Sequence, residues 1–390
     1  TGGQRSGTWR LSHRIFRRSP HAVARENEFS PYSVMKSREK YIREVWEGKR
    51  SGLFDVLLVL LLTPFSCLYS LLMKVREALY RAGILRSRAL PKPVISVGNI
   101  SVGGTGKTPM TILLARLLTA KGKRVAVLSR GYGGSGTGEA RIVSDGTNIL
   151  LSSKEAGDEP FLMAVSVPGL IVVAGADRYR AGLEACERFH PDILLLDDGF
   201  QHLRLRRDLN ILLLDHRRPF GNGRTLPAGL LREPRSAMRR ADLIVYTRCG
   251  EKESLPSHAG VPLCRSSHCL RGVAPLGSGP VSDFSILQGR RGVAFAGIAD
   301  PESFFDSLRA EGLELAATVP LPDHCLYDRE IIDSLRGVLR QSDGDYLITT
   351  EKDAVKLTPF DATFGEAYAA VLDLKLEDPR ILEREVEKLL

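Results

Sequence analysis

The chain has 390 residues, of which 43% are hydrophobic, so it can bury two cores and is too long for one ordinary domain. Its formal net charge of +9 favours an acidic partner, which can be nucleic acid, anionic lipid or a phosphorylated substrate. The six cysteines are scattered along a long chain and form no C-x-x-C pair, which indicates a reducing compartment rather than a small disulfide framework. The spacing of Cys264 and Cys269 with His258 and His268 fits no common zinc finger or ribbon.

Residues 1–40 are rich in Arg and Ser, especially in their first 30 positions, and lack the apolar core of a secretory signal. We expect a disordered leader there, with a transit peptide of similar composition as the alternative.

Residues 41–90 contain a long apolar run, Leu53–Met73, whose length is sufficient to span a bilayer. Asp55 near its start, Pro64 in its middle and basic residues on both sides favour a helix that lies in one leaflet. A buried core helix is the alternative, and the pattern does not decide between insertion and a full span.

From residue 91 to residue 263, apolar runs of strand length alternate with helical patterns, which predicts an α/β fold with a parallel sheet covered on both faces. The expected strands are 94–97, 125–128, 170–174, 193–196, 211–214 and 243–246, with a helix at 109–120. Residues 264–289 predict a linker or ribbon. A smaller α/β domain is expected at 290–390, with strands at 293–296, 346–349 and 368–372 and helices at 302–311 and 380–390.

A glycine-rich loop between the first expected strand and helix has the features of a phosphate-binding loop (P-loop). It consists of Ser101, Val102, Gly103, Gly104, Thr105, Gly106, Lys107 and Thr108. Its backbone N–H groups can surround an anion, Lys107 adds a positive charge, and the Thr108 hydroxyl can hold Mg²⁺. Ser101 stands where the general P-loop pattern has glycine, but the strand before the loop and the helix after it support the interpretation. The sequence therefore predicts a nucleoside triphosphate site rather than an ordinary glycine turn.

Paired carboxylates follow a buried strand at Asp197 and Asp198. Ligands of open parallel sheets bind at the carboxyl ends of the strands, so this pair is expected to face the P-loop, where one carboxylate can hold Mg²⁺. Two acids in an ordinary turn are the alternative. Asp158 is a candidate for orienting a hydroxyl group and taking its proton, with His324 as a possible helper.

An ordered set of motifs resembles the tetraacyldisaccharide 4'-kinase family of lipid A biosynthesis, from about Tyr41 to the C-terminus. The motifs are Ser101-Val-Gly-Gly-Thr-Gly-Lys-Thr108, Ser129-Arg-Gly-Tyr-Gly-Gly134, Gly157-Asp-Glu-Pro160, Asp197-Asp-Gly-Phe-Gln-His202, Arg224-Thr-Leu-Pro-Ala-Gly-Leu-Leu-Arg-Glu-Pro234 and Thr349-Thr-Glu-Lys-Asp353. Asp323-His324-Cys325 departs from the Asp-His-His of the family. Ser101 in place of glycine is usual there.

The resemblance implies a P-loop kinase that transfers the γ-phosphate of ATP to the 4'-hydroxyl of tetraacyldisaccharide 1-phosphate, giving the 1,4'-bisphosphate (lipid IVA). It implies that Lys107 and Thr108 bind phosphate and Mg²⁺, and that Asp158 with His324 activates the hydroxyl. The same resemblance assigns the metal and nucleotide to four further residues, with Asp197 and Gln201 at the metal and Asp198 and Glu233 at the nucleotide.

The implied location is the cytoplasmic face of the bacterial inner membrane, as a peripheral or monotopic protein without an obligate protein partner. One rival is a membrane-associated regulatory ATPase or GTPase that phosphorylates no lipid. A second rival is a nucleic-acid protein that uses the arginines between Arg204 and Arg240, but that run lacks the interleaved aromatic residues that stack on bases. We therefore expect no nucleic-acid partner.

Overall fold

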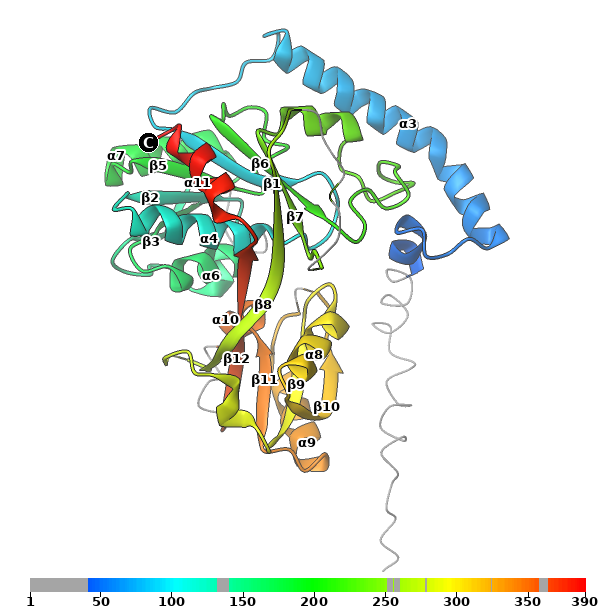
Figure 1. Ribbon diagram of the computed structural model, residues 1–390, viewed down its shortest axis with the longest axis vertical. Coiled ribbons are helices and arrows are strands. Elements are labelled where there is room, and N and C mark those ends of the chain that lie inside the picture. Colours follow the sequence, from blue (N-terminus) through cyan, green and yellow to red (C-terminus); the bar gives the residue numbers. More distant parts are fainter. Residues whose placement is uncertain are drawn as a thin grey trace, which may run out of the picture.

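The computed structural model describes residues 41–131, 140–250, 255, 260–277, 279–323, 325–357 and 364–390, so the expected leader lies outside the described residues. A single sheet of 12 strands has the order β10-β9-β11-β12-β8-β7-β6-β1-β5-β2-β4-β3. It extends through two lobes, which Figure 1 shows one above the other.

The larger lobe contains β1 (Val94–Asn99), β2 (Val125–Ser129), β3 (Arg141–Asp145), β4 (Ile171–Ala174), β5 (Ile193–Asp197), β6 (Leu209–Asp215) and β7 (Leu243–Thr247). Its helices are α4 (Lys107–Ala120), α5 (Ser153–Ala156), α6 (Asp158–Ser166), α7 (Arg178–Phe189) and the 3-10 helix η2 (Arg235–Arg240). All strands expected in this part of the chain are confirmed, because each is an apolar run that the sheet buries on both faces.

The smaller lobe contains β9 (Arg291–Ala296), β10 (Glu314–Pro320), β11 (Tyr346–Thr350), α8 (Pro301–Ala310), α9 (Arg329–Gln341) and α10 (Glu351–Leu357). Helix α8 covers one face of its strands and α9 covers the other, each with its own buried cluster. Aspartates stabilise the starts of both helices, since Asp300 accepts a hydrogen bond from the Ser303 amide and Asp328 accepts one from the Ile331 amide.

Two long strands, β8 (Leu263–Pro275) and β12 (Ala367–Leu376), connect the lobes. They pair antiparallel with each other, whereas β8 pairs parallel with β7 and β12 pairs parallel with β11. The stretch 264–289, expected as a linker or ribbon, thus contains most of β8 and the short 3-10 helix η3 (Phe284–Leu287). The last helix, α11 (Pro379–Glu387), returns to the larger lobe (Figure 1).

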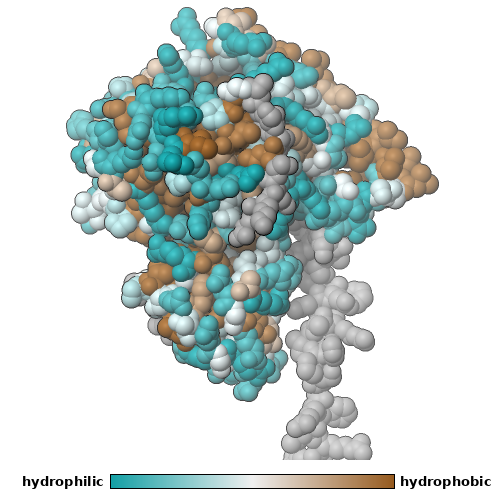
Figure 2. All heavy atoms as spheres, in the orientation of Figure 1, coloured by the Kyte–Doolittle hydropathy of each residue, from teal (hydrophilic) through white to brown (hydrophobic). Residues whose placement is uncertain are grey.

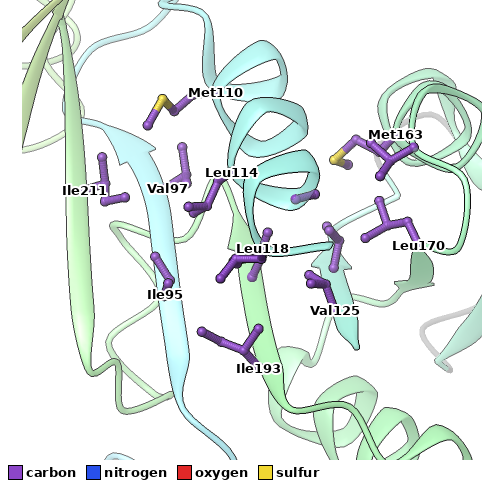
Figure 3. Close-up of a cluster of buried hydrophobic side chains, with 14 of the residues drawn as sticks. Ile95, Val97, Met110, Leu114, Leu118, Val125, Met163, Leu170, Ile193 and Ile211 are labelled. Carbon is purple, nitrogen blue, oxygen red and sulfur yellow. The ribbon is translucent and has the colours of Figure 1, made fainter. Parts of the chain in front are cut away.

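The main core lies between α4 and the strands of the larger lobe. Met110, Leu114 and Leu118 on one side of α4 pack against Ile95 and Val97 of β1 (Figure 3). Leu382 and Val386 of α11 belong to the same buried cluster, so the C-terminal helix helps to fix the position of α4. A second cluster under α7 covers the opposite face of the sheet. Burial on both faces holds the loop before α4 on a rigid base.

Helix α3 (Leu53–Arg81) is long and apolar enough to cross a membrane by length and composition alone. It is not a core helix, because only 6% of its most apolar window is buried. Figure 2 shows a hydrophobic patch where its N-terminal end projects from the body. Polar contacts attach its other side, since the Tyr69 hydroxyl donates to the Arg232 carbonyl and Arg76 donates to the Gln201 carbonyl, at 2.9 and 2.8 Å.

Candidate active site

The loop between β1 and α4 has the backbone conformation of an anion-binding loop. Gly103 and Gly106 have φ angles of +117° and +84°, which are strained for residues with a Cβ atom. Ser101 instead forms an antiparallel bridge with Leu231, so the position where the general pattern has glycine is extended here and accepts a serine. The side chain of Asn99 donates to the Thr105 hydroxyl at 2.8 Å and links the two ends of the loop.

His268 of β8 lies directly against this loop. A Cβ atom on Gly106 would lie 2.6 Å from His268 Nε2, so any other residue there would displace this imidazole in addition to straining the backbone. Burial, with a contribution from Arg248, lowers the pKa of His268 to about 4, and the imidazole is therefore neutral at pH 7. The strand that joins the lobes thus contacts the P-loop through an uncharged side chain.

Asp197 and Asp198 differ in environment although they are adjacent in the chain. Asp197 ends β5, is 2% exposed and accepts a hydrogen bond from the Thr111 hydroxyl at 3.2 Å. Burial, followed by the charges of Glu159 and Asp198, raises the pKa of Asp197 to about 7. Burial acts in the same direction on Asp198, but Lys107 and Arg232 outweigh it and lower the pKa of that carboxyl.

Two cations hold Asp198. Arg232 donates to both carboxylate oxygens at 3.1 and 2.9 Å, and Lys107 Nζ lies 3.9 Å from Oδ1. A third cation, Arg178, is 5% exposed, and burial lowers its pKa to about 10 while Asp197 and Asp198 oppose that shift. Cations and carboxylates therefore lie side by side next to the P-loop, and Lys107 and Arg232 are of the residue types that bind phosphate groups.

The structure also brings Gln201 and Glu233 together, next to Asn99 at the end of β1. The Gln201 side-chain nitrogen donates to the Asn99 carbonyl at 2.7 Å and to a Glu233 carboxylate oxygen at 3.4 Å. Glu233 is 1% exposed and pairs with Arg240, which also lies 3.3 Å from Glu77 of α3. The amide nitrogen of Gln201 makes both bonds, so its amide oxygen is the atom that can reach a cation.

Asp158 begins α6, at the boundary between the lobes. Its Oδ2 atom lies 3.4 Å from Lys356 Nζ of α10. The next residue, Glu159, is close enough to Asp197 to raise the pKa of that carboxyl, which places the start of α6 beside the P-loop site. The proposed helper of Asp158, His324, lies outside the described residues.

The model of the family described as tetraacyldisaccharide-1-P 4'-kinase matches residues 58–390. The chain belongs to this family. The tetraacyldisaccharide 4'-kinase of Geobacter metallireducens is 57% identical over 338 residues, which are 87% of this chain and 100% of that protein. The protein of the same name in Geobacter sulfurreducens is 54% identical over 348 residues, 89% of this chain and 98% of that protein.

The fold also matches a solved member of the tetraacyldisaccharide 4'-kinase family. A crystal structure of LpxK from Aquifex aeolicus in complex with ATP is 38% identical and superimposes with a TM-score of 0.73. The match covers 85% of this chain and 99% of that chain. The α/β architecture with a large parallel sheet is thus shared between the two proteins.

The side chains that hold the candidate acids of this tetraacyldisaccharide 4'-kinase family member were not predicted from the sequence. Arg232 and Lys356 pair with Asp198 and Asp158. Arg232 lies within the Arg224–Pro234 motif, yet only the fold shows that Asp198 is its partner. Lys356 follows the Thr349–Asp353 motif by three positions, but nothing in the sequence shows that it is buried or that it pairs with Asp158.

The described ranges contain no group of three or more His, Cys, Asp or Glu side chains that could hold a metal by itself. The donors that do lie near the P-loop fit Mg²⁺, because this ion is usually bound through one or two carboxylates together with substrate phosphates and water. Asp197 supplies a buried carboxylate, and Thr108, the second residue of α4, supplies a hydroxyl.

Proposed function

We propose that the chain transfers the γ-phosphate of ATP to the 4'-hydroxyl of tetraacyldisaccharide 1-phosphate and so forms the 1,4'-bisphosphate lipid of lipid A biosynthesis. One observation carries the proposal: a P-loop meets a pair of carboxylates at the carboxyl ends of β1 and β5 in a chain that matches the kinase family over residues 58–390. In phosphoryl transfer, catalysis consists mainly of positioning and charge stabilisation, which such an arrangement provides.

In this proposal, backbone amides from Ser101 to Gly106 surround the ATP phosphates. Lys107 moves from Asp198 to the outer phosphates, and Arg232 continues to hold Asp198. The 3.9 Å separation of Lys107 and Asp198 supports this step, because the pair is too long for a strong hydrogen bond. Glu233, which is held in place by its ion pair with Arg240, is a further residue of the proposed nucleotide site.

Thr108, Asp197 and Gln201 are the proposed ligands of Mg²⁺. When bound, this ion neutralises phosphate charge and orients the γ-phosphate. The raised pKa of Asp197, about 7, is that of a buried carboxylate with acidic neighbours, an environment that favours a bound cation.

Asp158 is the proposed base that takes the proton of the 4'-hydroxyl, with His324 as its partner. Its position at the first turn of α6 supports this role, because the turn lies at the junction of the lobes, beside the carboxylate pair. We further propose that residues 91–263 form the kinase domain and residues 290–390 the smaller domain, joined at 264–289. Their closure would exclude water from the transferring group.

The acceptor lipid is proposed to bind along α3, within a segment at residues 41–90 that contacts the cytoplasmic face of the inner membrane. A cavity of about 370 Å³ between α3 and the 223–235 segment supports this, because Lys74, Arg224 and Arg235 line it together with Ser66 and Ser70. Cations beside an exposed apolar helix suit a phosphorylated lipid.

The deciding experiment measures transfer of labelled γ-phosphate from ATP to tetraacyldisaccharide 1-phosphate in mixed micelles. We expect labelled lipid with the intact protein and none with Lys107→Ala. Asp158→Asn should lower kcat by about 100-fold or more while ATP binding stays close to normal. Free inorganic phosphate without labelled lipid would overturn the proposal and favour the regulatory ATPase.

A further inference from the structure

We propose that Lys356 is a positioning residue of the kinase reaction, which holds Asp158 and the backbone at Cys325, the residue after His324, in one arrangement across the junction of the lobes. The inference rests on the proposed function, because it gives a role to a residue that acts through the proposed base. The evidence is the set of contacts around one buried ammonium group.

The Lys356 side chain is 7% exposed and has three oxygen neighbours from three elements. Its Nζ atom lies 3.4 Å from Asp158 Oδ2 of α6, 3.2 Å from Asp353 Oδ1 of α10, and 3.3 Å from the carbonyl oxygen of Cys325. An ammonium group has three N–H donors. Two of the contacts, to Asp353 and to the Cys325 carbonyl, are hydrogen bonds, and the contact to Asp158 is an ion pair. The positive charge of Lys356 is therefore balanced within the protein by two carboxylates.

Asp353 gives this lysine a rigid anchor. Its carboxylate is fully buried and accepts hydrogen bonds at Oδ2 from the Gly297 amide, at 2.9 Å, and from the Thr350 hydroxyl, at 2.8 Å. The ring of Tyr327 lies 5.6 Å from the ammonium nitrogen and closes another side of the group. Burial, followed by the charges of Asp353 and Cys325, raises the pKa of Tyr327, so this neighbour is uncharged at pH 7.

The side chain of Asp158 is 20% exposed, whereas that of Asp353 is 0% exposed. The cation is thus anchored on the smaller lobe and reaches across to a carboxylate of the larger lobe. The same nitrogen fixes the Cys325 carbonyl, one residue after His324. A single side chain consequently sets the separation of the proposed base and the segment of its proposed partner, which is the kind of positioning on which phosphoryl transfer depends.

The test compares steady-state kinetics of Lys356→Met, Lys356→Arg and the intact full-length protein in the micelle assay. Removal of a positioning group should lower kcat about 10- to 100-fold and leave KM for ATP within about threefold, because the P-loop is unchanged. Lys356→Arg keeps the charge and should recover part of that loss. Lys121→Gln is the control, since it also breaks a lysine–carboxylate pair between two elements, the surface pair Lys121–Glu387 at the far end of α4, and should leave kcat within about twofold.

Loss of one member of a buried ion pair can also unfold a protein, so a second variant keeps the test decisive. The double variant Lys356→Met/Asp353→Asn removes one positive and one negative charge and leaves Asp158 intact. We expect it to fold, to bind ATP normally and to remain as slow as Lys356→Met. Recovery of kcat in this double variant, or unchanged kcat in folded Lys356→Met, would overturn the positioning role. If the intact protein phosphorylates no lipid, the proposed function fails instead.

Discussion

At the scale of single residues, adjacent acids acquire different properties from their neighbours. Asp197 is enclosed in the sheet with acidic neighbours, and the pKa of its carboxyl rises to about 7. Asp198, with a φ angle of +49°, turns toward Lys107 and Arg232, which lower the pKa of its carboxyl. The sequence predicts both acids at one strand end, but only the left-handed backbone at Asp198 explains how one faces the cations while the other faces Thr111.

Buried histidines give a prediction on stability against pH. The pKa of His268 is lowered to about 4, chiefly by burial, from an ordinary 6.5. Between these values the unfolded chain binds the extra proton, so the contribution of His268 to the free energy of unfolding is full above pH 6.5 and falls by about 1.4 kcal/mol for each pH unit below it. His202 acts in the same direction, and Asp197, with its raised pKa, acts in the opposite direction.

Because the effects of the histidines and of Asp197 on the pH dependence of stability have opposite signs, the contribution of His268 is measured as a difference between the intact protein and a His268 variant. Urea unfolding of the intact protein and of His268→Gln at pH 7.5 and pH 5.0 should show that the intact protein loses more stability than the variant on acidification. Equal losses would show that the imidazole is not held neutral beside Gly106.

At the scale of elements, the sequence predicted those whose burial follows from their own composition. Strands such as β5 and β7 are continuous apolar runs, and each one is fully buried in the sheet. Strand β8 was not predicted, because its residues alternate in burial and its stability comes from pairing with the distant β12. Helix α7 was missed because, apart from Arg178, its buried face consists of small residues, including Gly182, where a Cβ atom would lie 2.3 Å from Leu90.

The same distinction applies to the candidate site. The P-loop, Asp158 and the carboxylate pair are contiguous motifs and could be found from the sequence. Lys356, Arg232 and His268 could not be assigned, since each acts on a residue from a different element.

Helix α3 provides a prediction at the same scale. Its side chains Leu60, Leu61 and Leu68 are 57%, 69% and 56% exposed, and transfer of each from water into lipid should contribute roughly 1 kcal/mol or more. Replacement of all three by glutamine should therefore weaken binding to vesicles that contain anionic phospholipid by about 100-fold or more. The matched control replaces Ile149, Leu150 and Leu390, which are exposed elsewhere, and should float with vesicles like the intact protein. Continued flotation of the α3 variant would point to a different anchor.

At the scale of the whole molecule, elements that are far apart in the sequence share one hydrophobic core. The first strand, β1, and the last helix, α11, belong to the same buried cluster around α4. Strands β8 and β12 belong to one continuous sheet, and α11 packs Leu382 and Val386, at 1% and 0% exposed, against the cluster that holds α4. The P-loop helix therefore depends on residues at the far end of the sequence. Folding of the kinase domain is expected to require the C-terminal helix.

This dependence is tested with two leucines near the C-terminus. Leu382→Ala removes a buried side chain and should lower the free energy of unfolding by about 2–5 kcal/mol. Leu390→Ala, at a position that is 45% exposed, should change it by less than about 1 kcal/mol. In urea, ATP binding by Leu382→Ala should disappear at a lower concentration than in the control, because loosening of α11 frees α4 and with it Lys107. If both variants lose ATP binding at the same urea concentration, α11 does not support the P-loop in solution.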